Sequence, residues 1–171
     1  NAVLATNQNR RVIAVTHWAG SDTTPSNLSP GGEAIYAALK HNTNFFMMLG
    51  GHVAGNGGEG SRSDTYQGRT VRTFISDYQG HMNGGNGWMR LMYFSPSNNT
   101  VVIQTYSPWL SRFETDANSE FTLDFIMSEP FATGGAAVVP SGTNASFTAA
   151  GLQSSTKYEW RVTATNEAGR S

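Results

Sequence analysis

One apolar segment that runs directly into a pair of glycines constrains the fold of this chain most. Residues 45–49 (FFMML) are apolar, and Gly50, Gly51 and His52 follow them at once. A short apolar run bounded by glycines is typical of a strand covered on both faces, although a buried helical segment has the same pattern. Because glycines permit a sharp turn, we expect His52 at the carboxyl end of a strand, where ligands bind in open α/β sheets.

A second segment has the same design. Residues 11–17 (RVIAVTH) read as a β-branched strand that ends in His17, and residues 30–41 between the two segments place apolar side chains on one helical face. A right-handed crossover makes the two strands parallel and brings His17 and His52 to one sheet edge. Two imidazoles there are a candidate metal site. The alternative is that each ring is an ordinary buried, hydrogen-bonded side chain.

These motifs carry a family resemblance. Thr16-His17 after an apolar strand, followed by LGGHV at 49–53, resembles the last two metal-binding motifs of the calcineurin-like metallophosphoesterases. The runs DYQ (77–79), GNGWMRL (85–91) and TYSP (105–108) look like the secreted bacterial branch of that family. The resemblance covers about residues 8–127. It implies a β-rich α/β (α+β) sandwich that represents the carboxyl-terminal half of the metallophosphoesterase fold.

The resemblance also assigns metal ligands. It implies that His17 and His52 bind one ion of a two-metal centre, while Ala54 stands where a second motif histidine binds the other ion. The Asp-x-His, Gly-Asp-x-x-Asp and Gly-Asn-His motifs of the earlier half occur nowhere in the sequence. We therefore expect a phosphoesterase fragment with no catalytic residue of its own and little activity alone. Zn, Mn or Fe ions and a phosphoester substrate belong to the intact parent.

Two imidazoles form an incomplete metal shell, because even a catalytic zinc normally has three protein ligands. The alternative of metal-free histidines therefore stays open for this chain alone. Its expected partners are the missing amino-terminal half or a second copy of itself.

Three further residues are candidates for substrate binding. Trp18 either lines a pocket beside His17 or packs on the sheet edge. Arg62, in a loop expected over residues 55–69, either meets a phosphate or is solvated or paired with Glu59 or Asp64. Asn86, in Gly85-Asn86-Gly87, either presents backbone amides to an oxyanion or belongs to a turn that needs positive φ.

The rest of the chain reads mainly as strands. Period-two patterns predict strands over residues 70–78 and 121–125 and a hairpin of residues 88–94 and 101–106. The composition shifts near residue 128, so we expect one domain over 1–128 and a second over 129–171. Residues 151–166, with Leu152, Tyr158 and Trp160, resemble the later strands of a fibronectin type III domain. A whole domain of that kind needs about 100 residues, so this antiparallel β-sandwich is expected to be partial.

Composition excludes several classes of protein and of binding site. The net charge of −1 offers no electrostatic footprint for nucleic acid, and the absence of cysteine removes disulfides and thiolate metal sites. No apolar run approaches the roughly 20 residues of a membrane span. Sequons at Asn27, Asn98 and Asn144 lie in expected loops. We expect a bacterial extracellular or periplasmic protein, with a non-catalytic adhesion or assembly module as the alternative function.

Overall fold

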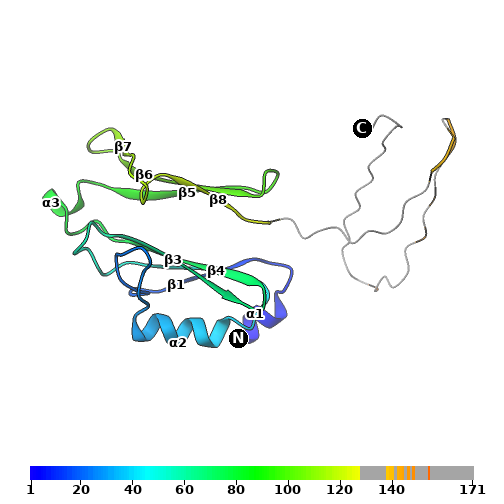
Figure 1. The fold of residues 1–171 in the computed structure, drawn as a ribbon, viewed down its shortest axis with the longest axis horizontal. Coiled ribbons are helices and arrows are strands. Elements are labelled where there is room, and N and C mark those ends of the chain that lie inside the picture. The colour runs from blue at the N-terminus through cyan, green and yellow to red at the C-terminus, as the bar shows by residue number, and fades with distance from the viewer. Residues whose placement is uncertain (128–137, 141, 145, 147, 149–153, 155–171) are drawn as a thin grey trace. The chain divides into compact units, whose positions relative to one another are not determined.

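The computed structural model describes residues 1–127, 138–140, 142–144, 146, 148 and 154. The chain divides into two compact units, residues 1–125 and 126–171. Within the first unit, Figure 1 shows a helical layer, a sheet above it and a second sheet above that. The helical layer holds α1 (Ala2–Thr6) and α2 (Pro30–Leu39). The expectation of a β-rich fold with two sheets and few helices is therefore confirmed.

The first sheet has the strand order β1-β2-β4-β3. Its members are β1 (Val12–Val15), β2 (Phe45–Gly50), β3 (Glu59–Tyr66) and β4 (Arg69–Ser76). β1, β2 and β4 run parallel, and β3 is antiparallel to β4. The predicted strand–helix–strand unit with two parallel strands is confirmed, and its helix ends at Leu39 rather than at residue 41.

Helix α2 begins where local chemistry favours it. The Ser29 hydroxyl accepts a hydrogen bond from the Gly32 amide at 3.0 Å, and Pro30 occupies the first helical position. Gly32 packs so closely on Ala19 that an added Cβ would lie 2.0 Å from the Ala19 carbonyl oxygen. Ile35 and Leu39 pack on the cluster of buried Phe45 and its neighbours. The helix thereby covers one face of the first sheet.

The second sheet is antiparallel throughout. It contains β5 (Met89–Ser95), β6 (Thr100–Ser107), β7 (Arg112–Glu114) and β8 (Phe121–Asp124), with β6 in contact with all three others. Alternate residues of β6 are buried, which is the pattern of a strand with one face on a core. The predicted hairpin and the strand near residue 121 are confirmed. A short helix, α3 (Met82–Gly85), precedes β5.

The apolar side chains form one core on each face of the first sheet. Between sheet and helix lie Phe45, Met48 and Ile75. Between the two sheets, Phe46, Met47 and Phe74 form a second cluster, against which apolar side chains of the second sheet pack: Met92, Phe121, Leu123 and Phe125. β2 therefore contributes to both cores, as its continuous apolar sequence predicts.

One sequence-based expectation about local structure is wrong. Residues 59–66, expected within a loop, form the edge strand β3, because backbone pairing with β4 requires no apolar side chains. Residues 1–10 include helix α1, and the Asn44 side chain donates to the carbonyl oxygen of Leu4 in this helix. The turn at 85–87 does have positive φ at all three residues, as predicted.

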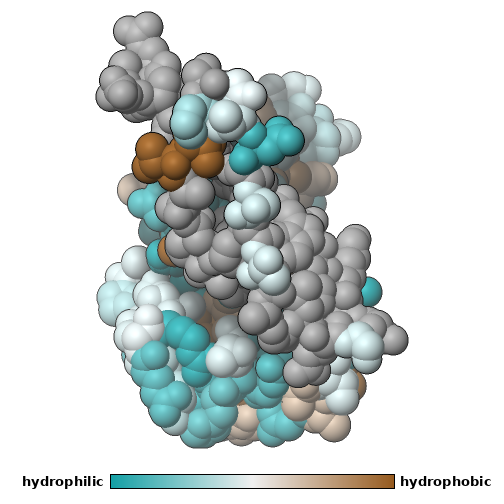
Figure 2. Space-filling model, turned by 90° about the vertical axis from the view of Figure 1, so that its right-hand side faces the viewer, coloured by the Kyte–Doolittle hydropathy of each residue, from teal (hydrophilic) through white to brown (hydrophobic). Residues whose placement is uncertain are grey.

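Most of the second unit lies outside the described residues. The fibronectin-like residues Leu152, Tyr158 and Trp160 are among these, so that module and the boundary at 128/129 stay predictions. In the view of Figure 2, the surface of the described residues is mostly hydrophilic or near neutral, and its hydrophobic residues gather in small areas. No helix in the described part of the chain has the length and apolar character needed to cross a membrane.

Candidate metal site

His17 and His52 meet at the carboxyl edge of the first sheet. His17 lies two residues beyond β1 and His52 two residues beyond β2, and the parallel strands carry both to the same edge. Their ring centroids are 4.4 Å apart in an edge-on arrangement. Backbone pairing continues past the strands and fixes the two segments together, since the Gly51 amide donates to the His17 carbonyl oxygen at 2.9 Å.

The backbone around His52 is unusual. His52 has a φ of 70°, a left-handed conformation that is uncommon for residues other than glycine and somewhat less so for histidine. Gly50 is needed beside it, because an added Cβ would lie 2.6 Å from the Cβ of Ala19. Unusual backbone held by close packing is found frequently at functional sites. Here the close packing aims the His52 ring at His17.

Both imidazole rings are exposed, which separates them from ordinary buried histidines. The structure gives neither ring a hydrogen-bond partner among the described residues. The Trp18 ring lies 5.4 Å from the His52 ring and is 44% exposed. Trp18 thus stands beside the histidine pair, and its role in substrate binding stays a prediction.

A cavity of about 540 Å³ opens next to His17. It lies between the carboxyl ends of the first sheet and β5, and its lining is mainly apolar: Val15, Leu49, Trp88, Met89 and Met92. The polar side chains of Tyr78 and Arg90 also line it. This volume is within the range of small-molecule sites.

A buried carboxylate anchors these two polar side chains. Glu59 Oε1 accepts hydrogen bonds from the hydroxyls of Tyr78 and Thr105, each at 2.6 Å, and pairs with the Arg90 guanidinium. Its Oε2 accepts from the Ser119 hydroxyl at 2.7 Å. Glu59 and Arg90 are both buried, so this network ties the first sheet to the second beside the cavity. Burial in this network raises the pKa of the Tyr78 phenol to about 12.

A second buried carboxylate fixes the loop that follows His52. Asp22 accepts hydrogen bonds from the backbone amides of Asn56 and Gly58 and from the Asn56 side chain. Burial by itself raises the pKa of Asp22, but these hydrogen bonds outweigh it and hold the pKa below its usual value. The loop that carries His52 is therefore held at Gly51, by the His17 carbonyl oxygen, and at Asn56 and Gly58, by Asp22.

The remaining candidates lie apart from the histidine pair. Arg62 is paired with Asp64, with nitrogen–oxygen distances of 2.8 to 2.9 Å, which matches the structural alternative for this residue. Asn86 is the left-handed cap of α3, and its carbonyl oxygen accepts from the Ser107 hydroxyl. The chain's two other histidines each have a partner of their own: His81 contacts the Gly57 carbonyl oxygen at 3.1 Å, and His41 contacts the Tyr66 hydroxyl at 2.9 Å.

Sequence reasoning missed the two buried carboxylates, Glu59 and Asp22. Both contact partners far along the chain, and a residue expected in a loop gives no sign of burial. The sequence SRSDTY at 61–66 has no alternation of apolar and polar residues, so the pattern gave no signal of a strand there.

The donor set fits part of a metal shell. Two exposed imidazoles that meet edge-on are suitable ligand types for Zn²⁺, Mn²⁺ or Fe, which imidazole binds well. Within the described residues, no group of three or more His, Cys, Asp or Glu side chains is placed to hold an ion. Asp77 follows β4 at the same edge, where its carboxylate accepts from the backbone and side chain of Gln79.

Comparison with known proteins gives one curated relative, YvnB of Bacillus subtilis (strain 168), which bears the name "Uncharacterized protein". The two are 34% identical over 113 residues. The match covers 57% of this chain and 8% of the relative, so the chain spans a small part of that protein's length. No protein-family profile and no solved structure matches the chain significantly.

Proposed function

We propose that residues 1–128 are the carboxyl-terminal half of a calcineurin-like metallophosphoesterase, in which His17 and His52 bind one of two divalent ions. The observation that carries this proposal is the meeting of the two exposed rings at 4.4 Å on the carboxyl edge of parallel strands. When bound in a complete centre, such ions supply an activated water and neutralise phosphate charge. Within this chain, the two histidines hold an ion and Trp18 shapes the rim beside it.

The open side of the sandwich supports the view that this chain is one part of a larger fold. β1 and β5 are edge strands of their sheets. Val15 lies opposite Leu49, which packs into the core between the sheets, yet Val15 is 76% exposed. Phe94 lies opposite buried Val101 and is 41% exposed. Apolar side chains on the inner faces of two edge strands favour a partner that extends both sheets.

The proposal gives the chain alone little activity, because two imidazoles cannot complete the centre. The test compares hydrolysis of a chromogenic phosphoester by this chain and by a version extended upstream in the same gene, each with excess Mn²⁺ or Zn²⁺. The extended version should be active and should lose activity with His52→Ala but not with His41→Ala. Robust turnover by the short chain, or equal effects of the two substitutions, would contradict it.

The open edges also favour a second candidate, a non-catalytic extracellular module for adhesion or assembly. Unpaired edge strands with apolar side chains are templates for pairing with other chains. Bound metal measured after purification, together with light scattering, separates the candidates. Stoichiometric metal favours the phosphoesterase, and metal-free oligomers favour assembly. In either case we propose a bacterial protein located outside the cytoplasm, in keeping with the bacterial source of the matched relative.

A further inference from the structure

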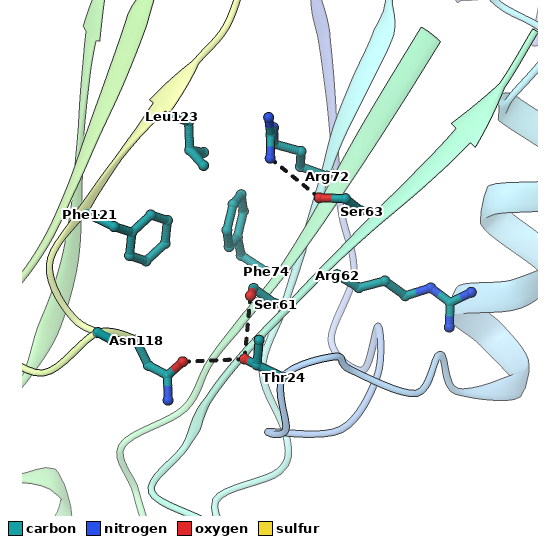
Figure 3. Close-up of a pocket in the computed structure, with 10 residues that line it drawn as sticks. Thr24, Ser61, Arg62, Ser63, Arg72, Phe74, Asn118, Phe121 and Leu123 are labelled. Atoms are coloured by element: carbon teal, nitrogen blue, oxygen red, sulfur yellow. Dashed lines mark hydrogen bonds between the residues drawn. The ribbon is translucent and has the colours of Figure 1, made fainter. Parts of the chain in front are cut away.

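A second cavity lies on the other side of the sandwich, beside the edge strand β3 (Figure 3). Its volume is about 190 Å³, which is smaller than a drug-sized pocket and large enough for one small molecule. Phe74 is the one residue whose atoms line both this cavity and the cavity beside His17. The two cavities are therefore distinct sites, and the histidine pair has no part in this one.

One end of this cavity carries a positive charge. The Arg72 guanidinium on β4 donates to the Ser63 hydroxyl on β3 at 3.3 Å, and no described carboxylate pairs with it. Arg62 and Arg90, by contrast, each pair with a carboxylate, and Figure 3 shows the Arg62 side chain directed away from the cavity. Arg72 keeps donors for a ligand, and the planar guanidinium suits a carboxylate.

The opposite end carries neutral polar groups. The Thr24 hydroxyl contacts the Ser61 hydroxyl and the Asn118 side-chain oxygen, each at 3.4 Å. These hydrogen bonds are long and therefore weak, so all three groups can turn towards hydroxyls of a ligand. Ser61 and Ser63 are two residues apart along β3, which separates the two polar ends by about 7 Å.

The wall between the two ends is apolar. Phe121 packs against the buried Phe74 ring with ring centroids 6.0 Å apart, and Leu123 lies beside them (Figure 3). Aromatic rings of this kind pack against the C–H face of a sugar ring. The cavity thus offers a cation, an aromatic wall and a set of hydroxyl and amide groups in that order.

We propose that this cavity binds a small hydroxylated carboxylic acid of the size of one uronic acid. The carboxylate lies on Arg72, the ring lies on Phe121, and the distal hydroxyls face Thr24, Ser61 and Asn118. A single pyranose ring spans a distance similar to that between the polar ends. The site is independent of the proposed phosphoesterase centre, and its test uses neither metal nor phosphoester.

The experiment is an amide NMR titration of the full chain with sodium glucuronate. Saturable shifts are expected at Ser61, Ser63, Arg72 and Asn118. Glucose, which lacks the carboxylate, and glucuronamide, in which it is a neutral amide, should each bind at least about tenfold more weakly. Because these ligand controls use the unaltered protein, they keep the test valid if a variant fails to fold.

Matched arginine variants provide the second arm. Arg72→Gln should weaken glucuronate binding at least about tenfold, whereas Arg62→Gln should leave it unchanged, with folding of each checked by thermal unfolding. The proposal is overturned if glucuronate causes no shifts at these residues, if glucose or glucuronamide binds equally well, or if folded Arg72→Gln binds as the unaltered chain does.

Discussion

The rings of His17 and His52 lie 4.4 Å apart, centroid to centroid, although the two residues follow different strands. Neither ring makes a hydrogen bond to a described residue. Two exposed imidazoles in contact gain little for stability, because a ring that is accessible to water buries little apolar surface. Their approach is imposed by the parallel pairing of β1 with β2 and by the left-handed backbone at His52. This arrangement is the basis of the proposed metal site.

The first prediction concerns the glycine that sets this approach. Gly50→Ala places a Cβ 2.6 Å from the Cβ of Ala19 and 2.7 Å from its amide nitrogen, so β2 must move away from the segment carrying His17. We expect a loss of about 1–3 kcal/mol in the free energy of unfolding, measured in urea. Gly55→Ala is the matched control, since no atom lies within 4 Å of its added Cβ. Equal losses in the two variants would show that the packing at Gly50 is not tight.

The second prediction concerns the buried pair of Glu59 and Arg90. Glu59→Gln keeps the shape of the side chain but leaves the buried Arg90 charge without its partner, so the free energy of unfolding should fall by about 3–5 kcal/mol. The comparison is Asp64→Asn, which breaks the more exposed pair with Arg62 and should cost at most about 1 kcal/mol. Similar costs in the two variants, measured in urea, would contradict the role of Glu59 as the link between the sheets.

The third prediction concerns stability at high pH. Burial raises the pKa of Tyr78 to about 12, above the ordinary tyrosine value of about 10. The folded chain therefore holds this proton more tightly than the unfolded chain. The resulting stability is fully present below the unfolded pKa of about 10 and is lost as the pH rises through 12, a loss of about 2–3 kcal/mol.

Urea unfolding at several pH values between 9 and 12 measures this loss. Tyr78→Phe lowers stability at every pH because its hydroxyl no longer bonds Glu59, but its decline above pH 10 should be shallower. If the free energy of unfolding falls equally steeply above pH 10 in the unaltered chain and in Tyr78→Phe, the loss comes from groups other than Tyr78.

The fourth prediction concerns the open side of the sandwich. Val15→Lys should change the free energy of unfolding by no more than about 0.5 kcal/mol, because this side chain is 76% exposed. Val71→Lys, at a position that is 3% exposed, should cost several kcal/mol, since it buries an unpaired charge. If Val15→Lys is as damaging as Val71→Lys in thermal unfolding, β1 is covered and the sandwich is closed on that side.

Local sequence patterns predict the centre of this fold well. The apolar runs that end in His17 and His52, with an amphipathic helix between them, are sufficient to predict parallel strands and the approach of the two rings. The hairpin predicted from residues 88–94 and 101–106 likewise corresponds to β5 and β6. In each case the residues that decide the structure are neighbours in the sequence.

Features that depend on distant partners could not be predicted in this way. β3 is a strand because β4 lies beside it, and its sequence EGSRSDTY has almost no apolar residues to indicate this. Glu59 is buried because it contacts Arg90 and Thr105 of the second sheet and Ser119, which lies between β7 and β8.

The most direct test of the central claim is a Zn²⁺ titration of this chain by isothermal calorimetry, with His17→Ala, His52→Ala and His41→Ala beside it. We predict one weak site per chain, since two imidazoles supply only part of a shell. Its affinity should fall at least about tenfold in either of the first two variants and stay unchanged in the third. Equal Zn²⁺ affinity in all four proteins would contradict a shared metal ion between His17 and His52.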